Sequence, residues 1–330
     1  MKSGLLCLTA LPLLAQSSLL AQSSLYVVAG AAKEYVVGAK LAASGLFRQT
    51  PTNTWEHLGY TVPFMCSLDY DPNDPSIIYM AAGNGLIRGA NGGKDWTIVT
   101  GSDITELRDL VVTPTAIYIA HSRGIRVSKD RGKTWAELSG KLHRKFTEAL
   151  RVDRTNPSVL LAGGEEGVFR SEDGGQTWKP SGAGSYQIAH LEQSPHDPAT
   201  WLAATQGGGV YISRDGGKTF ESPSEAPGVG RNLYDVAFDP TNPNRMAVGG
   251  WGPGVTVSED GGKTWAARNV GLPRPDVSAI IFDPAHSGRI YASVHEEAIF
   301  VSDDVGKSWK PSGMEGRVGN RMKFIPGGSK

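Results

Sequence analysis

The chain has little of several features that define large functional classes. Among its 330 residues are only two cysteines, Cys7 and Cys66, which excludes a disulfide framework and a multi-cysteine metal site. Basic and acidic residues each number 33 without a long run of one sign, so the electrostatic footprint of a nucleic-acid-binding protein is missing. Beyond the first 15 residues, no apolar stretch is long enough to span a bilayer.

The first 21 residues resemble a secretory signal peptide. Lys2 precedes an apolar run from Gly4 to Ala15, and small and polar residues follow that run. We predict cleavage after Ala15 or Ala21, although large leucines occupy the −3 position in both cases. A lipid anchor on Cys7 is the alternative, but this cysteine comes before a full apolar region has passed. The sequence therefore predicts an exported protein, either periplasmic or extracellular.

Glycine and proline are abundant, with 42 and 20 residues, and many glycines belong to a recurring motif. The copy SEDGGKTW ends in Gly-Lys-Thr like a phosphate-binding loop, but Val257 stands where such a loop needs glycine. Related copies begin at Ser128, Ser171, Ser213 and Ser302, and a worn copy, GANGGKDW, ends at Trp96. A phosphate site is rarely built five or six times in one chain, so we predict no nucleotide or other cofactor.

The motif recurs with a period of about 43 residues. Its acidic position, once replaced by asparagine, advances in steps of 39, 43, 42, 45 and 44 along Asn91, Asp130, Asp173, Asp215, Asp260 and Asp304. Each unit contains short alternating segments separated by Gly, Pro and Asp turns, which is typical of four strands. Repeats of this length and content indicate an all-β fold, a β-propeller with four antiparallel strands in each blade.

The blade count is seven. Six units carry a recognisable motif, and residues 34–40, 45–49 and 54–59 read as the second, third and fourth strands of a further unit. Residues 320–326 read as a first strand with nothing after it. We therefore predict one seven-bladed propeller over residues 22–330, closed by the C-terminal strand joining the N-terminal blade, which removes exposed sheet edges.

The motif itself is best explained as a structural clasp at the turn between third and fourth strands. Its Asp and Ser side chains can accept backbone N–H groups that a tight turn leaves unpaired, and its glycines supply positive φ. A calcium loop is excluded because no copy has the closing glutamate. An aromatic residue then opens the fourth strand and is expected to pack against the neighbouring sheet: Trp96, Trp135, Trp178, Phe220, Trp265 and Trp309.

The pattern Ser-x-Asp-x-Gly-x-Thr-Trp resembles the Asp-box, also called the bacterial neuraminidase repeat. This repeat is found in sialidases, xyloglucanases, the sortilin ectodomain and photosystem II assembly (stability) factors. The resemblance covers nearly the whole mature chain and implies a propeller, but it does not imply one activity. The single propeller, the leader and the seven blades look most like the photosystem II stability-factor type.

The catalytic motifs of the enzymes that contain this repeat are poorly matched in this sequence. Sialidases place Arg-Ile-Pro before their first box, whereas the nearest match here, LFRQTP at 46–51, lacks Ile-Pro. Asp-box xyloglucanases use two propellers and a catalytic Asp just before Gly-Gly, and Gln206 stands at the nearest position here. Because an amide cannot act as a general base, the sequence favours a binding protein over an enzyme.

The turns between second and third strands vary from blade to blade, so we expect function on the rim that they share. Glu165 and Glu166 in one turn and Glu296 and Glu297 in another could form a carboxylate pair, with solvated turn residues as the alternative. Two histidines on this rim, His121 and His295, could bind a metal, but they have no signature spacing, so we expect ordinary surface residues. We therefore assign no metal site.

Two further binding candidates lie near the expected channel. Trp251 sits between glycines in a turn and could stack on a sugar or a peptide side chain, or pack as a loop residue. Aligned first strands place a mixed-charge ring at the channel mouth: Arg108, Asp109, Glu148, His190, Tyr234, Asp235, Asn320 and Arg321. This ring could bind a polar ligand or a partner's loop, or form the salt-bridged wall of a water-filled channel.

Taken together, the residues favour an exported, non-catalytic propeller that binds a protein or a glycan through its variable rim, with an envelope assembly factor as one form. The alternative is an Asp-box glycoside hydrolase that uses the turn carboxylates, and a purely structural surface module is a third possibility. We expect a monomer with no nucleic-acid partner and no transmembrane segment after removal of the leader.

Overall fold

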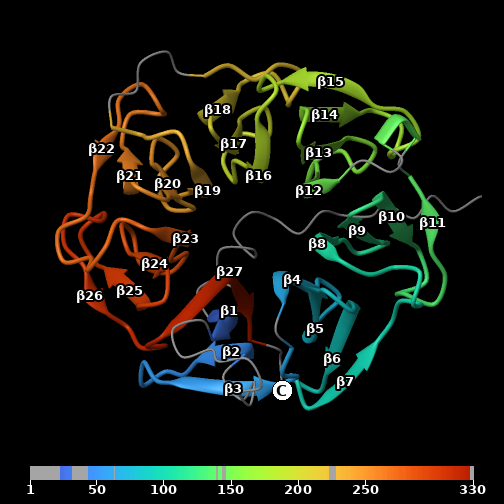
Figure 1. Cartoon of the computed structure of the whole chain (residues 1–330), viewed down its shortest axis with the longest axis horizontal. Coiled ribbons are helices and arrows are strands. Elements are labelled where there is room, and N and C mark those ends of the chain that lie inside the picture. The colour runs from blue at the N-terminus through green and yellow to red at the C-terminus, as the bar shows by residue number, and fades with distance from the viewer. Residues whose placement is uncertain are drawn as a thin grey trace, which may run out of the picture.

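The computed structural model describes residues 23–31, 44–62, 64–138, 140–142, 146–222 and 228–327. In these ranges, strands β1 to β27 form seven sheets arranged as a closed ring (Figure 1), and one short 3-10 helix, η1 (Gly140–Leu142), lies between β11 and β12. This confirms the all-β, seven-bladed propeller. Within the described ranges, no helix is long and apolar enough to span a membrane.

The first three blades are numbered from the N-terminal one, and their strands are given from the ring centre outward. Blade 1 contains β27 (Arg317–Pro326), β1 (Ser23–Ala31), β2 (Gly45–Gln49) and β3 (Trp55–Gly59). Blade 2 contains β4 (Met65–Asp71), β5 (Asp74–Ala82), β6 (Gly85–Ala90) and β7 (Asp95–Ile98). Blade 3 contains β8 (Leu107–Val112), β9 (Ile117–His121), β10 (Gly124–Ser128) and β11 (Ala136–Glu137).

The remaining four blades follow the same plan. Blade 4 contains β12 (Thr147–Val152), β13 (Leu160–Gly164), β14 (Gly167–Ser171) and β15 (Lys179–Gly182). Blade 5 contains β16 (Gln187–Gln193), β17 (Trp201–Gln206) and β18 (Gly209–Ser213), and a bridge between Ile212 and Glu221 marks its fourth strand. Blade 6 contains β19 (Leu233–Phe238), β20 (Met246–Gly250), β21 (Gly254–Ser258) and β22 (Ala266–Ala267). Blade 7 contains β23 (Val277–Phe282), β24 (Ile290–Val294), β25 (Ala298–Ser302) and β26 (Lys310–Pro311).

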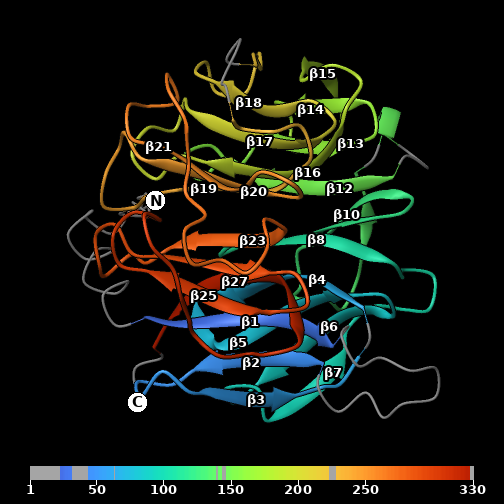
Figure 2. The same cartoon turned by 60° about the vertical axis from the view of Figure 1, so that its left-hand side comes forward.

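The ring is closed by the C-terminal strand, as predicted. β27 pairs antiparallel with β1 from Ser23 opposite Pro326 to Ala31 opposite Arg317, and the two strands lie side by side in Figure 2. The prediction that residues 34–40 form the second strand of this blade was wrong, because β1 occupies that place; residues 34–40 lie outside the described ranges. Both segments contain Tyr-Val-Val, so their hydrophobic patterns do not distinguish them.

The hydrophobic core lies between neighbouring blades. Among the described residues, one cluster joins Val257 of blade 6 to Ile280 of blade 7, and another joins Val27 of blade 1 to Ile299 of blade 7. Each sheet is therefore covered by the next one around the ring, which explains why most residues of the second strands are buried, as in β17 from Trp201 to Thr205.

The motif forms the clasp that its residues predict. At Asp260, Oδ1 accepts the N–H groups of Lys263 (3.0 Å) and Thr264 (2.9 Å), while Oδ2 accepts the Thr264 hydroxyl (2.6 Å). Ser258 Oγ donates to Asp260 and accepts the N–H of Gly262 at 2.8 Å. The same pattern recurs at Asp130, Asp173, Asp215 and Asp304. In the worn copy, Asn91 instead donates to Asp95.

Most of the tryptophans after the clasps join their blade to the one before it, whereas Trp265 Nε1 donates to the carbonyl of Gly262 within its own clasp. Trp96 Nε1 donates to the carbonyl of Leu58 at 3.2 Å, and Leu58 lies three residues after the tryptophan of blade 1. The indoles of Trp135, Trp178 and Trp309 donate in the same way to Val99, Leu138 and Arg268, and Trp55 completes the ring through Ser312. These bonds make the clasp tryptophans connectors between blades as well as core residues.

Two faces follow from this topology. Clasp glycines bind the turns between first and second strands, as in Gly261 N–H to the carbonyl of Asn244 at 2.8 Å. The clasps and these turns, many of which contain Asp-Pro, therefore share one side of the ring, here called the Asp-Pro face. The turns between second and third strands lie on the opposite side, here called the variable face.

Candidate functional site

The seven inner strands surround a central cavity of about 530 Å³. Each inner strand contributes to its wall, from Ser67 of β4 and Ile280 of β23 to Arg321 of β27. The lining also includes Pro72, Pro114 and Pro157, which lie at or beyond the ends of inner strands, in the turns of the Asp-Pro face. The cavity therefore opens on the Asp-Pro face, whereas the variable turns led us to expect function on the opposite rim.

A β-bulge at the same place in every inner strand sets which side chains reach the channel. The register shifts once near the start of each strand, for example between Leu107 and Asp109 and between Leu233 and Asp235. The residues that follow the bulges occupy equivalent positions: Ser67, Asp109, Ala149, His190, Asp235, Ala279 and Arg321. This register agrees with the alignment of first strands made from the sequence.

Three residues of the predicted mixed-charge ring lie inside the channel rather than at its mouth, which corrects the prediction. Asp109, His190 and Asp235 are 1%, 5% and 2% exposed. The reason is that the carboxylates bind the backbone of the next inner strand. Asp109 Oδ2 accepts the N–H of Leu150 at 3.0 Å, and Asp235 Oδ2 accepts that of Ile280 at 2.9 Å. These acids therefore help to join neighbouring blades.

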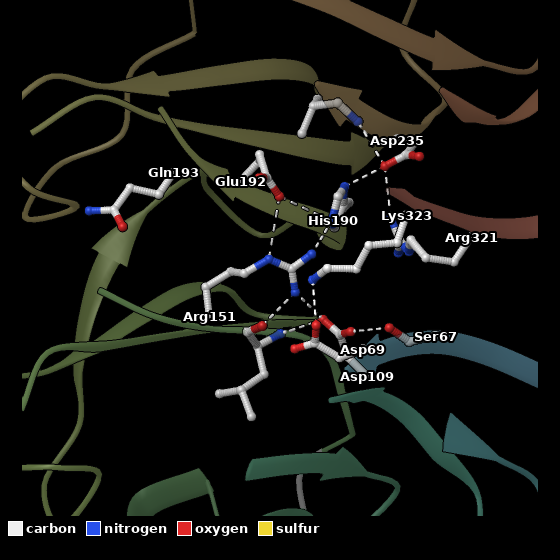
Figure 3. Close-up of polar contacts among 12 residues, drawn as sticks. Ser67, Asp69, Asp109, Arg151, His190, Glu192, Gln193, Asp235, Arg321 and Lys323 are labelled. Atoms are coloured by element: carbon white, nitrogen blue, oxygen red, sulfur yellow. Dashed lines mark hydrogen bonds and ion pairs between the residues drawn. The ribbon is translucent and has the colours of Figure 1, made fainter. Parts of the chain in front are cut away.

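A chain of paired side chains crosses the channel floor (Figure 3). Arg151 Nη1 binds Asp109 Oδ2 at 2.6 Å, and Arg151 Nη2 contacts Nε2 of His190. His190 Nδ1 contacts Oδ1 of Asp235, which also accepts Arg321 Nη1 at 2.7 Å. Because a guanidinium group can only donate, Nε2 of His190 must accept, so this imidazole is neutral and its proton sits on Nδ1.

The electrostatics of these paired side chains favour fixed protonation states. Burial alone would raise the pKa of Asp109, but Arg151 and then Arg321 more than offset burial and lower it. The pKa of Asp235 is lowered in the same way, mainly by Arg321. Burial, followed by the charge of Arg321, lowers the pKa of His190. At neutral pH the floor therefore contains ionised carboxylates and an uncharged histidine.

A second layer of charged groups lies two residues further along the inner strands. Lys323 Nζ binds Asp69 Oδ1 at 2.6 Å, and Glu192 Oε2 lies 3.5 Å from Nε of Arg151. The side chains of Lys323 and Glu192 are 38% and 39% exposed, so they present one charge of each sign to the cavity. We did not single out these residues from the sequence. Extending the first-strand alignment by the two-residue period of a strand would have found them.

Arg108 packs between aromatic rings at the end of the channel on the variable face. Its guanidinium lies between the rings of Phe64 and Phe146, 4.9 and 4.7 Å from their centroids. These rings come just before the inner strands of blades 2 and 4, so Arg108 of blade 3 links three blades. Its Nε is 3.9 Å from Glu148, and burial raises the pKa of that carboxyl and of the Cys66 thiol, the latter to about 11.

The four turn glutamates do not form one site. Glu165 and Glu166 follow β13 of blade 4, and Glu296 and Glu297 follow β24 of blade 7, with blades 5 and 6 between them on the shorter way around the ring (Figure 1). Glu165 and Glu166 are exposed beside a separate cavity of about 240 Å³ whose lining includes Phe146 and Phe169. The proposed carboxylate pair therefore cannot span the two turns.

The histidines of the variable rim also remain apart from one another. His121 ends β9 and is buried, with burial lowering its pKa, so it is not the surface residue we expected. His295 lies four blades further along the chain. Among the residues that the structure describes, no group of three or more potential ligand side chains could hold a metal ion.

Trp251 is the most exposed of the predicted ligand-binding residues. It lies in the turn between β20 and β21 on the variable face and is 44% exposed. Its ring lies 5.5 Å from that of Tyr234 and 5.1 Å from that of His295. Gln206, which stands near the position of a catalytic acid in the xyloglucanase resemblance, pairs in the sheet with Gln187 and bridges to Asn232.

No protein-family model matches this chain, and no curated protein is detectably similar to it in sequence. Among solved structures it is similar to the GH74 enzyme of Niastella koreensis, with a TM-score of 0.68 and 19% identity over 89% of this chain and 54% of that one. The GH74 xyloglucanase from Xanthomonas campestris gives a TM-score of 0.62 and 18% identity over 75% and 45% of the two chains. YCF48 bound to D1 peptide gives a TM-score of 0.58 and 17% identity over 75% and 80%.

These similarities show the propeller fold. The chain spans about half the length of the GH74 enzymes that it resembles and is closer in length to YCF48. The same fold occurs in the GH74 enzymes and in YCF48, which was solved with a bound peptide. The function therefore has to be argued from the residues of this chain.

Proposed function

We propose that this chain is a non-catalytic propeller that binds a segment of a partner protein in its central cavity, from the Asp-Pro face. The observation that carries this proposal is a cavity of about 530 Å³ whose buried carboxylates are already paired. That volume is in the range of ligand pockets. Its acids are occupied by cations and backbone N–H groups, so they stabilise the ring and leave the cavity as a binding surface.

The cavity wall indicates the chemistry of the segment. The cavity wall includes the half-buried apolar side chains of Val111 and Ile281, at inner-strand positions equivalent to those of Arg151 and Lys323. Lys323 and Glu192 add one partly exposed charge of each sign in the same layer. A loop or terminus with an apolar side chain and a nearby polar group would match both parts of this surface.

A glycosidase is less well supported by the same residues. Retaining and inverting enzymes need two carboxyl groups about 5–9.5 Å apart, one of them an acid with a raised pKa. In the described part of the chain, Glu148 has a raised pKa, but Arg108 is its nearest charged partner. The floor acids Asp109 and Asp235 have lowered pKa values and cannot donate a proton at neutral pH.

We also propose that the protein works outside the cytoplasm as an assembly or scaffold factor. The support is the leader-like N-terminus together with the fold shared with YCF48. A rigid ring that offers a preformed cavity suits a protein that holds a partner during assembly. We expect it to act as a monomer.

Site-specific crosslinking tests the proposal. A photoreactive amino acid at Ile281, in the cavity, should capture one predominant partner in the producing cells, and the same group at Val270, which is 73% exposed elsewhere, should not. Val111→Lys should reduce capture at Ile281 without unfolding the ring, because equivalent inner-strand positions already hold Arg151 and Lys323. Equal capture at both positions would contradict the proposal.

The hydrolase alternative is supported by the structural similarity to GH74 enzymes and by the position of Glu296 beside His295, next to exposed Trp251. It predicts hydrolysis of xyloglucan, β-glucan or a sialoside that is abolished by Glu296→Gln or Glu165→Gln. If the purified protein cleaves none of these substrates, this alternative is rejected. Cleavage that depends on either glutamate would replace the binding proposal.

A further inference from the structure

A second surface, on the variable face, is built from Trp251 and its two aromatic neighbours. We propose that Trp251 is a stacking platform for one pyranose ring of a neutral glycan. This inference does not depend on the cavity, because Trp251 lies at the opposite end of the inner strands. There, Gly250, just before Trp251, pairs with Leu233 at the start of β19.

The backbone of this turn is held firmly although its tryptophan is exposed. Trp251 N–H donates to the carbonyl of Asn232 at 3.0 Å, and Trp251 bridges to Asp276 of the neighbouring segment. Gly252 N–H donates to the carbonyl of Pro275 at 3.0 Å, and its φ of 92° is a conformation that favours glycine. An indole on such a turn loses little conformational entropy when a ligand binds.

The indole itself is held by two other rings. Tyr234, the bulge residue of blade 6, lies 5.5 Å away at an interplanar angle of 45°. His295, at the end of β24 in blade 7, lies 5.1 Å away with its ring edge-on at 69°. These contacts are in the favourable range for aromatic pairs, and they hold the exposed ring in place between two blades.

The charged groups around the platform argue against an anionic ligand. Arg274 binds Asp276 with both Nε and Nη2 at 2.7 Å from Oδ2, so its positive charge is already neutralised. Glu296, whose Oε1 lies 3.7 Å from His295 Nε2, adds a carboxylate beside the indole. An anion is therefore repelled here, whereas these polar groups can exchange hydrogen bonds with the hydroxyls of a neutral ligand.

The size of the exposed apolar surface argues for a sugar ring rather than a protein partner. Protein interfaces bury about 800 Å² on each side around several anchors. Of the other large exposed hydrophobic residues of the described chain, Phe64 and Ile98 belong to blade 2, and Val270 lies in the segment that links β22 of blade 6 to β23 of blade 7. One tryptophan face matches one pyranose, whose C–H groups are attracted to the negative face of the ring when its hydroxyls are equatorial.

The full chain titrated with soluble neutral hexasaccharides tests this assignment. We expect cellohexaose and chitohexaose, whose β-1,4-linked rings present flat C–H faces, to bind in calorimetry and to change tryptophan fluorescence, and maltohexaose to bind more weakly. Trp251→Ala should weaken binding at least about tenfold, and Phe64→Ala, which removes an equally exposed ring elsewhere, should leave it unchanged. Because these saccharides carry no charge, binding should not change between low and high salt.

Two results would overturn the assignment: no binding of any of these saccharides, or equal binding by the Trp251→Ala variant. Hydrolysis of the bound saccharide would instead support the enzyme alternative. Crosslinking at Ile281 reports only on the cavity, so a failure of glycan binding and a failure of partner binding can be told apart. If both sites are occupied as proposed, the protein connects a polysaccharide on one face to a partner protein on the other.

Discussion

At the scale of single residues, the clasp aspartates are the most regular feature of the molecule. The Thr264 hydroxyl, followed by backbone N–H groups, lowers the pKa of Asp260 to about 2. The pKa values of Asp130, Asp173, Asp215 and Asp304 are also about 2. These five clasps therefore hold their donors with an ionised carboxylate at neutral pH.

This predicts a specific loss of stability in acid. The carboxyl pKa is about 3.9 in an unfolded chain and lower in the folded one, so the contribution is complete above that pH and disappears as pH falls toward 2. Chemical denaturation between pH 2 and 6 should show wild-type stability falling steeply below pH 4. Asp260→Asn should be less stable at pH 7 and show a shallower slope.

The matched control is Lys263→Gln, which keeps the carboxylate and the backbone donors of the same clasp. It should follow the wild-type pH curve. If Asp260→Asn has the same pH slope as the wild type, the carboxylate does not have the lowered pKa that the clasp geometry requires.

Much at this scale could be predicted from the sequence. The roles of Asp and Ser in the clasp follow from local hydrogen bonding within one turn, which the motif contains completely. The bonds from Trp96, Trp135, Trp178 and Trp309 to the preceding blade could not be predicted from the motif, because each acceptor is a backbone carbonyl about 40 residues away. The same limit applies to Arg108, whose ring partners Phe64 and Phe146 lie in two other blades.

At the scale of elements, β27 is the strand on which the ring depends. It supplies the inner strand of blade 1 and pairs with β1 along the whole of that strand. Period-two alternation and the absence of a following strand were enough to predict this exchange. The identity of its partner was not predicted correctly, because two neighbouring Tyr-Val-Val segments have the same pattern and only the three-dimensional register selects one of them.

Removing β27 should open the ring. We expect a chain that ends at Gly316 to lose cooperative unfolding and to aggregate, since the exposed edge of β1 can pair with other chains. A synthetic peptide covering 317–327 should restore cooperative thermal unfolding when it is added in excess.

The control peptide carries Met322→Asp and Ile325→Asp, two changes at buried positions of β27. It should not restore the ring. A truncated chain that unfolds like the full chain would mean that blade 1 does not need its inner strand.

At the scale of the whole molecule, the channel floor links blades that are distant in sequence. Asp69, Asp109, Arg151, His190, Asp235, Arg321 and Lys323 come from six of the seven inner strands (Figure 3). The alignment of first strands brought most of the bulge positions together correctly. It did not reveal depth, because burial in the channel depends on the diameter of the closed ring and on bonds to the next strand.

Replacing Arg151 alone should lower the free energy of unfolding more than replacing Arg151 and Asp109 together. Arg151→Met leaves the buried Asp109 carboxylate without its cation, and we expect a loss of about 3–5 kcal/mol in the free energy of unfolding. Asp109→Asn in the same chain should recover part of that loss, because an uncharged amide oxygen can still accept the N–H of Leu150.

A double-mutant cycle in urea measures this coupling. The matched single variant is Asp109→Asn alone, which leaves Arg151 facing Glu192 and should cost less than Arg151→Met. Additive losses in the double variant would show that the two side chains act independently.

The position of β27 also has a consequence for the order of events during synthesis. The strand made first, β1, lies between β2 and the strand made last, so one of its edges has no partner until the final residues leave the ribosome. Six blades can assemble while the chain grows, but the circle can be completed only once β27 has been made. Until then blade 1 lacks its inner strand, so its completion is the last step of folding.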